Sequence, residues 1–402
     1  MSDILGFMGE LLLLLLCLPV VCWTLYLGFL AILSWPLKAP ARLEDPQLRF
    51  DVVVPAHDEA LSIAKTVKSL LAMDYPKDFF RVMVVADNCT DETADRAREA
   101  GAVVVERTNP RLRGKGYALA YGFRRALAEG AEAVVVVDAD TTVSKNLLQS
   151  FAARLSAGEV AVQAHYGVAN PDASWRTRLM RIALSMFHGV RSVARERMEL
   201  SAGLRGNGMC FRAWVLREVP HEAFSLVEDL EYGIRLGRRG YRVAYAPEAQ
   251  VLGEMVSGEK ASRSQRHRWE QGRSAMLKLY GWPLLRDAVL QRSALLMDLA
   301  MDVLVPPLSR VVMLAMVGAV SSAALFELAG YGAISSAAFG FSLGALGLYV
   351  VAGWLHSGTG LRGLADLGMA PAYVAWKVML SFKGATNRSD WVRTTREGET
   401  RT

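Results

Sequence analysis

A run of four valines followed by two aspartates constrains the fold more than any other stretch of this sequence. Residues 134–137 are all valine, and Asp138 and Asp140 follow with one alanine between them. A continuous β-branched run predicts a strand buried on both faces, as in a central parallel strand covered by helices. In open α/β sheets, ligands bind beyond the carboxyl ends of the strands. Two carboxylates there suit a divalent cation and its phosphates, although an isolated pair is better explained as an acidic turn.

Residues 50–105 alternate between short apolar runs and amphipathic segments. The expected elements are strands at 50–54, 81–85 and 103–105, with helices at 61–71 and 93–100. Strands that alternate with helices predict the α/β class, with a doubly wound, mostly parallel sheet.

Polar side chains gather just beyond the first two of these strands. Pro55 closes the first strand and is followed by His57, Asp58 and Glu59, and the second strand is followed by Asp87, Asn88 and Asp91. Each group alone is explained as a helix cap. Two such groups at successive carboxyl ends predict that both border one crevice.

The sequence lacks the common dinucleotide and nucleotide-triphosphate loops. There is no Gly-x-Gly-x-x-Gly after the first strand and no Gly-x-x-x-x-Gly-Lys-Ser/Thr anywhere. Residues 111–116 instead form a basic, glycine-bearing loop in which Lys115 offers a point charge to a diphosphate. A solvated turn before the alanine-rich helix expected at 117–129 explains this loop equally well.

Two further signals lie in the middle of the chain. Gly206, Asn207 and Gly208 leave the backbone bare, either for a ligand ring or for a simple turn. Glu228 and Asp229 open a helix expected to run to about residue 238. Acidic residues in a first turn favour the helix dipole, and a carboxylate at this position could also act as a general base.

Residues 263–280 form a basic amphipathic stretch that predicts a helix lying in a membrane interface. Amphipathicity does not explain why Gln265, Arg266, Arg268 and Trp269 are crowded into five residues.

The N-terminal region predicts a retained membrane anchor. Residues 11–37 carry no charge and can span a bilayer, and residues 1–10 lack the basic start of a cleaved signal peptide. Basic residues after the stretch place residues 1–10 outside the cell and the domain at 38–282 in the cytoplasm.

The C-terminal region, 283–402, predicts further membrane elements. We expect an interfacial helix at 288–305, spans at about 308–327 and 332–355, an interfacial or re-entrant segment at 369–382, and a basic cytosolic tail.

Composition supports a membrane protein that handles anions. The chain is 52% hydrophobic and has a net charge of +6. This modest excess fits anionic lipids and phosphates better than nucleic acid, for which no reading motif is present. The four cysteines have no spacing that indicates a disulfide framework or a zinc site.

Taken together, residues 50–282 resemble the membrane-embedded family 2 glycosyltransferases, which include cellulose, chitin and hyaluronan synthases and ceramide glucosyltransferase. The resemblance rests on four motifs in the family's order. They are Asp87, Asp138-Ala139-Asp140, Glu228-Asp229, and Gln265-Arg266-His267-Arg268-Trp269, which matches Gln-x-x-Arg-Trp. The first loop has His57-Asp58 where many relatives have Tyr-Asn, a difference that bears on donor preference.

The resemblance implies a GT-A fold and an inverting transfer from a nucleotide sugar, usually linked to uridine. Asp229 would deprotonate the acceptor hydroxyl. The remaining roles divide by ligand: Pro55, Glu59, Asp87, Lys115, Asp138, Gln265, Arg266 and Arg268 for the donor, Gly206, Asn207, Gly208, Glu228 and Trp269 for the acceptor, and Asp138 and Asp140 for Mg²⁺ or Mn²⁺.

The sequence therefore predicts a metal-dependent glycosyltransferase in a bacterial inner membrane, acting on a lipid or glycan acceptor among membrane lipids. A processive synthase that extrudes a β-glycan and an inactive scaffold that regulates another synthase remain alternatives. The sugar, the acceptor, the linkage and the oligomeric state are not fixed by these motifs.

Overall fold

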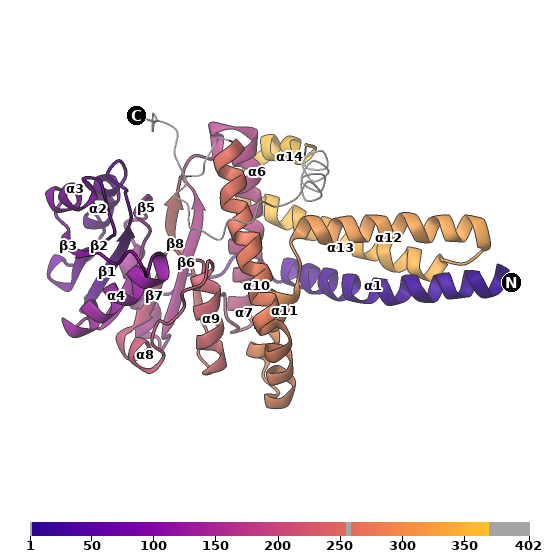
Figure 1. Ribbon diagram of the computed structural model, residues 1–402, viewed down its shortest axis with the longest axis horizontal. Helices are drawn as coiled ribbons and strands as arrows, with labels where there is room; N and C mark the ends of the chain where they lie inside the picture. The colour runs from indigo at the N-terminus through magenta and orange to yellow at the C-terminus, as the bar shows by residue number, and fades with distance from the viewer. Residues whose placement is uncertain (1, 255–258, 370–402) are drawn as a thin grey trace.

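The computed structural model describes residues 2–254 and 259–369, and it describes side chains for 4–254 and 271–369. The described chain has a globular body built on one sheet and a long helical arm that projects from it (Figure 1).

The body contains one sheet of eight strands in the order β3-β2-β1-β4-β7-β6-β8-β5. The strands are β1 (Phe50–Ala56), β2 (Phe80–Asp87), β3 (Val103–Arg107), β4 (Ala133–Val136), β5 (Thr141–Val143), β6 (Ala161–Val168), β7 (Met209–Arg212) and β8 (Ala244–Gly253). The three strands expected at 50–54, 81–85 and 103–105 are confirmed as β1, β2 and β3.

Most strand directions agree, as expected of a doubly wound sheet. The pairs β1–β2, β2–β3, β1–β4 and β6–β8 are parallel. The strands β7 and β5 run against their neighbours, so the sheet is mixed. Because β4 pairs in parallel with β1 and antiparallel with β7, its carboxyl end lies beside the start of β7.

Helices cover both faces of the sheet. Those of the body are α2 (Ile63–Leu71), α3 (Thr93–Glu99), α4 (Lys115–Ala128), α5 (Leu147–Ser156), α6 (Trp175–Leu184), α7 (Ser192–Arg197), α8 (Ala213–Glu218) and α9 (Glu228–Arg238), with single turns η1 (Lys77–Phe79) and η2 (Pro171–Ala173) and the π-helix η3 (Ser185–Arg191).

The valines of the central strands alternate between two cores. Val135 and Val137 face one core, where Ile63 of α2 and Phe151 of α5 pack. Val134 and Val136 face the other core, with α4 and α9. A central strand apolar on both faces is therefore buried by helices on both sides, as expected.

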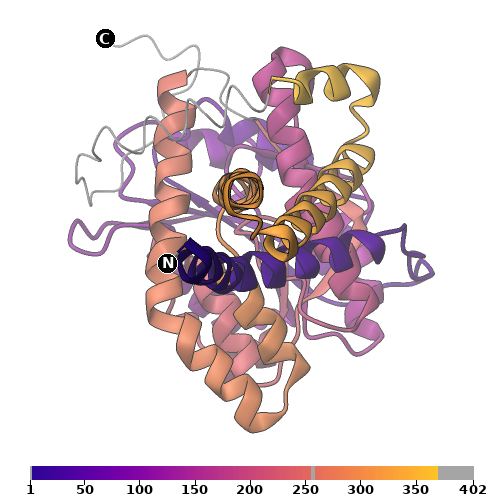
Figure 2. The same ribbon diagram turned by 90° about the vertical axis from the view of Figure 1, so that its right-hand side faces the viewer.

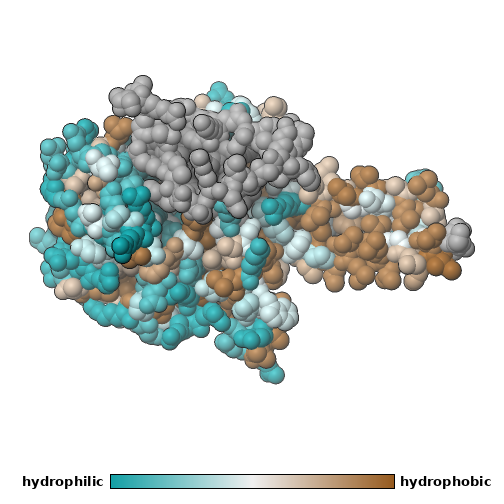
Figure 3. Space-filling model, in the orientation of Figure 1, coloured by the Kyte–Doolittle hydropathy of each residue, from teal (hydrophilic) through white to brown (hydrophobic). Residues whose placement is uncertain are grey.

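The arm consists of α1 (Ser2–Ile32), α12 (Leu308–Ala329) and α13 (Ala333–Ser357). Three segments, Ile4–Ile32, Leu308–Ala329 and Ala333–Ser357, are long and apolar enough to cross a membrane. Figure 3 shows the apolar surface of this arm beside the more polar body. The first helix lies earlier than the expected 11–37, and it ends before Pro36, consistent with the extended backbone that residues before proline prefer.

Two helices cross the base of the arm (Figure 2). The long helix α10 (Glu259–Gln291) includes the stretch expected at 263–280, and it continues through Pro283. The shorter α11 (Ala294–Leu304) begins later than the expected 288, because α10 occupies residues up to Gln291. Trp282 and Leu290 of α10 are exposed, and the interfacial position of these helices stays a prediction. The helix α14 (Gly360–Leu367) follows α13, and the segment expected at 369–382 lies outside the described residues after Met369.

Candidate active site

The loops after β1 and β2 are tied together, as their positions at neighbouring strand ends predict. Asp58 accepts a hydrogen bond at 2.7 Å from the backbone N–H of Thr90. A second hydrogen bond links the same two loops, because the N–H of Glu59 donates to the Thr93 hydroxyl at 2.7 Å. Pro55 is the last residue but one of β1, which ends at Ala56 directly before this junction. The two polar groups therefore form one wall at the carboxyl edge of the sheet.

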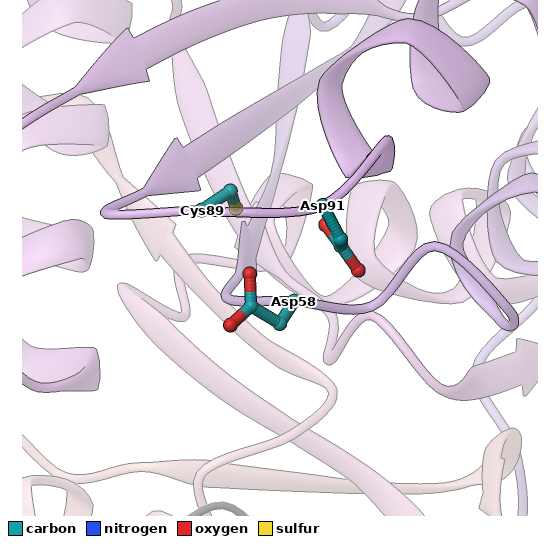
Figure 4. A group of neighbouring side chains, drawn as sticks. All are labelled: Asp58, Cys89 and Asp91. Carbon is teal, nitrogen blue, oxygen red and sulfur yellow. The ribbon is translucent and has the colours of Figure 1, made fainter. Parts of the chain in front are cut away.

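Asp58, Cys89 and Asp91 bring three possible metal ligands to this wall, with ligand atoms within 4.8 Å of one another (Figure 4). The aspartate oxygens already accept hydrogen bonds, Asp58 from Thr90 and Asp91 from Thr93. Burial raises the pKa of the Cys89 thiol, which disfavours the thiolate that a metal requires. These contacts are those of two loops held together by hydrogen bonds. Asp58, Cys89 and Asp91 therefore suit Mg²⁺ or Mn²⁺ less well than a site made of oxygen ligands alone.

Asp87 lies at the end of β2 and is buried against a basic partner. Its carboxylate forms an ion pair with Arg107 and accepts a hydrogen bond from Asn88 at 3.0 Å. Arg107 also donates to the carbonyl of Leu112 at 2.9 Å, which ties Asp87 to the loop before α4. Sequence reasoning did not single out Arg107, although its place at the end of β3 is a signal for it.

Lys115 joins the glycine-bearing loop to the paired aspartates. The residue is the first of α4, and its ammonium group contacts the carboxylate of Asp138 and donates to the carbonyl of Gly206 at 2.7 Å. Asp138 and Asp140 follow β4, and both are half-buried. Lys115 therefore lies at the centre of the site, where the alternative of a solvated basic turn does not apply.

Asn207 holds the loop that carries the two aspartates. Its side-chain oxygen accepts from the N–H of Asp138 at 3.1 Å, and its amide donates to the Thr141 hydroxyl at 2.8 Å. The residue is only 1% exposed. Gly208 has a φ of +68°, and a Cβ there would lie 2.8 Å from Val251. The Gly206–Gly208 segment is thus needed by the protein's own packing, in addition to any contact with a ligand.

Glu228 and Asp229 open α9 on the opposite side of Lys115. A Glu228 oxygen lies 3.8 Å from the Lys115 ammonium, and Glu228 is buried. Asp229 is half-buried, and a Cβ built on Gly206 would lie 3.4 Å from its Oδ2 atom. Both predicted carboxylates therefore meet the Gly206 segment and Lys115 in one cluster.

Burial controls the protonation of this cluster. It raises the pKa of Glu228 to about 7, against the opposing effect of Lys115, and the neighbouring Asp229 adds to the rise. Burial also raises the pKa of Asp229 above its usual value, while Lys115 and Arg205 oppose that rise. The pKa of Lys115 is raised because Asp138 and Glu228 outweigh its burial. Carboxylates with raised pKa values beside a cation are typical of sites that transfer protons.

Four predicted residues lie outside the described side chains: Gln265, Arg266, Arg268 and Trp269. The structure places their backbone on α10. All the other predicted site residues lie near the carboxyl edge of β1, β2 and β4, with Glu59 and Asp87 in the wall, and Lys115, Asp138, Gly206 and Asp229 in the cluster.

The mixed sheet with helices on both faces has the GT-A fold. The solved mannosyltransferase PcManGT from Pyrobaculum calidifontis, in complex with GDP-Man and Mn²⁺, has a similar fold. The TM-score is 0.54 with 18% identity, over 86% of this chain and 97% of that chain.

The protein belongs to the family described as glycosyltransferase like family 2, whose model matches residues 46–272, more than half of the chain. It is 26% identical over 260 residues to the probable glycosyltransferase YdaM of Bacillus subtilis, covering 62% of this chain and 60% of YdaM. It is 27% identical over 267 residues to the UDP-forming cellulose synthase catalytic subunit of Pseudomonas fluorescens, covering 61% of this chain but 34% of that protein. The expected family and fold are thereby confirmed.

Proposed function

We propose that the protein transfers a sugar from a nucleotide sugar to a membrane-associated lipid or glycan, with inversion and with a divalent metal. The resemblance to the family 2 glycosyltransferases favours a UDP-linked donor. The catalytic domain would face the cytoplasm from a bacterial inner membrane. The observation that carries this proposal is the single cluster formed by Lys115, Asp138, Gly206, Glu228 and Asp229 beside a membrane-type helical arm.

The donor side of the cluster consists of Asp138, Asp140 and Lys115. The two carboxylates supply the oxygen ligands that Mg²⁺ and Mn²⁺ prefer, and Asn207 fixes their loop. When bound, the metal would neutralise charge on the donor diphosphate. Lys115 would add a positive charge where the leaving diphosphate gains negative charge. The Pro55–Glu59 loop and Asp87 would contact the base and ribose.

The acceptor side consists of Asp229 and the glycine segment. Asp229 is half-buried, whereas Glu228 lies against Lys115, so Asp229 is the carboxylate better placed to meet an acceptor hydroxyl. Asp229 would take the proton from that hydroxyl as the hydroxyl oxygen forms a bond to C1 of the sugar. The bond from C1 to the nucleoside diphosphate would break at the same time, so that the diphosphate leaves and the anomeric carbon is inverted. Gln265, Arg266, Arg268 and Trp269 of α10 would complete the donor and acceptor contacts.

The test is to offer the purified full-length protein a panel of UDP-sugars and GDP-mannose with Mn²⁺ or Mg²⁺ and membrane lipid. We expect release of nucleoside diphosphate and transfer of the sugar to a lipid or glycan. If no donor in the panel gives a transferred sugar, the proposal fails.

The size of the product separates two forms of this function. The likeness to a cellulose synthase subunit favours a processive enzyme, but this chain covers only 34% of that relative. A single added sugar on a lipid would support the non-processive reaction, and a long polymer would support the processive synthase. An inactive scaffold would release no nucleotide.

A further inference from the structure

A cluster of four arginines, two of them fully buried and two partly buried, lies between the active site and the base of the arm. Arg191 of η3, Arg195 of α7, Arg205 of the loop before β7, and Arg273 of α10 meet the carboxylates or backbone of α11. The acidic partners are Asp298 and Asp302. Figure 1 shows α7, α10 and α11 gathered where the arm joins the body.

Ion pairing leaves this arginine cluster with positive charge in excess. Asp302 lies 3.1 Å from Arg191 and 2.9 Å from Arg195, and Asp298 lies 3.0 Å from Arg195. Arg205 lies 3.9 Å from Asp302, which is a long distance for an ion pair, and Asp302 is shared with the other arginines. Among the described residues, four guanidinium groups and two carboxylates leave two positive charges.

Arg205 has an unsatisfied donor in this environment. Its side chain is 7% exposed, and its Nε atom is buried with no hydrogen-bond partner among the described residues. The Nδ1 atom of the buried His188 in η3 also lacks a partner there. Asp298 Oδ2, which lies 3.0 Å from Arg195, is also without a hydrogen-bond partner there. Buried polar groups are nearly always satisfied, so the orphaned guanidinium donor indicates a missing acceptor, and the excess of positive charge favours an anion. Burial lowers the pKa of Arg205 to about 10, with Arg195 and Arg191 adding to the decrease, so an anion would relieve it.

Arg205 also connects this cluster to the acceptor carboxylate. It directly precedes Gly206, where an added Cβ would lie 3.4 Å from the Oδ2 atom of Asp229. On its other side the guanidinium lies over the ring of Phe187, 4.8 Å from the centroid, as do Arg191 at 4.4 Å and Arg273 at 5.5 Å. An anion bound by this cluster would lie beside Asp229, the proposed general base. It would also lie where α1, α12 and α13 leave the body.

We propose that Arg205, supported by Arg191, Arg195 and Arg273, binds the phosphate of a phospholipid acceptor, so that a head-group hydroxyl of the same lipid reaches Asp229. This inference rests on the proposed function for the role of Asp229. A phosphodiester carries one negative charge and would reduce the excess of two positive charges left by Asp298 and Asp302. The position at the base of the arm suits a lipid, whose chains would run along the membrane-type helices.

The test measures binding, without sugar transfer, on the full-length protein in a non-ionic detergent. The probe is short-chain phosphatidylglycerol, which has a phosphodiester and head-group hydroxyls. Diacylglycerol of the same chain length is the phosphate-free comparison, and inorganic phosphate tests whether the lipid is needed. We expect phosphatidylglycerol to bind at least tenfold more tightly than either.

The variant Arg205→Gln should lower the affinity for phosphatidylglycerol about tenfold or more. Arg310→Gln, which removes an exposed arginine near the start of α12, is the matched control and should change it less than threefold. Because Arg205 belongs to an over-charged cluster, its loss should not lower the melting temperature of the lipid-free protein. Phosphatidylglycerol should raise the melting temperature of wild type and Arg310→Gln but not of Arg205→Gln. Should Arg205→Gln fail to fold, Arg273→Gln provides the same comparison.

Equal affinity of wild type and both cluster variants, or binding of diacylglycerol as tight as that of phosphatidylglycerol, would overturn the inference. Binding of inorganic phosphate alone with the same affinity and the same loss in Arg205→Gln would show an anion site that is not for lipid. These results are independent of the proposed function, because a protein that transfers no sugar can still show the phosphate site. Conversely, the enzyme could transfer sugar to a neutral acceptor while Arg205→Gln binds phosphatidylglycerol as tightly as wild type. That result would support the proposed transferase function and overturn only the phosphate site.

Discussion

The ammonium group of Lys115 lies 3.8 Å from the carboxylate of Glu228 and also contacts Asp138. One cation therefore joins the first turn of α4, the loop after β4 and the first turn of α9. A change in the charge of any of these groups alters the pKa values of the others. The cluster can therefore be tested by varying the pH and by single substitutions.

The first prediction concerns pH. Asp229 must be ionised to accept a proton, and burial raises its pKa, so transfer should fall as the pH is lowered through that raised value. Arg205 opposes the rise in the pKa of Asp229, so the loss of its charge makes Asp229 harder to ionise. The acidic limb of the kcat/KM profile should therefore move to higher pH in Arg205→Gln, with the exposed Arg310→Gln as an unshifted control. A limb that stays in place or moves to lower pH would mean that Asp229 is not the titrating base.

The second prediction separates the two carboxylates. Asp229→Asn keeps the shape of the side chain but loses the proton acceptor, so transfer should fall about 10²–10⁴-fold. The affinity for UDP should change little, because no diphosphate contact is assigned to Asp229. Glu228→Gln should have a milder effect on the rate. Measurement of both variants side by side tests this order, and a wild-type rate in Asp229→Asn with a strong loss in Glu228→Gln would reverse the assignment.

The sequence predicted the parallel half of the sheet more fully than the rest. The valines of β1 and β4 and the polar residues after β1 and β2 follow simple rules of burial and strand ends, and they lie as expected. The strands β6, β7 and β8 were not predicted, because their antiparallel and bulged pairings depend on distant partners.

Two features of the site also depend on distant contacts. Asn207 was predicted from its flanking glycines as an acceptor contact, and the structure shows that it also fastens Asp138 and Thr141. Arg205 gave no signal in the sequence. Its burial arises from η3 and α11, which lie far from it along the chain.

The third prediction concerns the metal. If Asp138 and Asp140 hold Mg²⁺ or Mn²⁺, excess EDTA should abolish transfer and either cation should restore it. Asp140→Ala should weaken metal-dependent binding of UDP while the melting temperature stays within a few degrees of wild type. The exposed Asp95→Ala serves as the control. Full activity in excess EDTA would exclude the metal requirement.

The fourth prediction concerns orientation in the membrane. Charge bias places the body in the cytoplasm and the turn between α12 and α13 outside. In a cysteine-free background, Leu328→Cys should react with an impermeant thiol reagent in intact cells, because Leu328 is 87% exposed and lies at the end of α12, directly before that turn. Arg124→Cys on α4 should react only after the cells are opened. Labelling of Arg124→Cys in intact cells would invert the topology.

The central claim, an inverting glycosyl transfer, is tested most directly by following the anomeric carbon. A donor that supports turnover is prepared with ¹³C at C1 of an α-linked sugar, and the product is observed by NMR as it forms. We expect a new β-anomeric signal on the acceptor, which grows as nucleoside diphosphate is released and is lost in Asp229→Asn. A transferred sugar that keeps the α configuration would show retention and exclude the proposed inverting transfer.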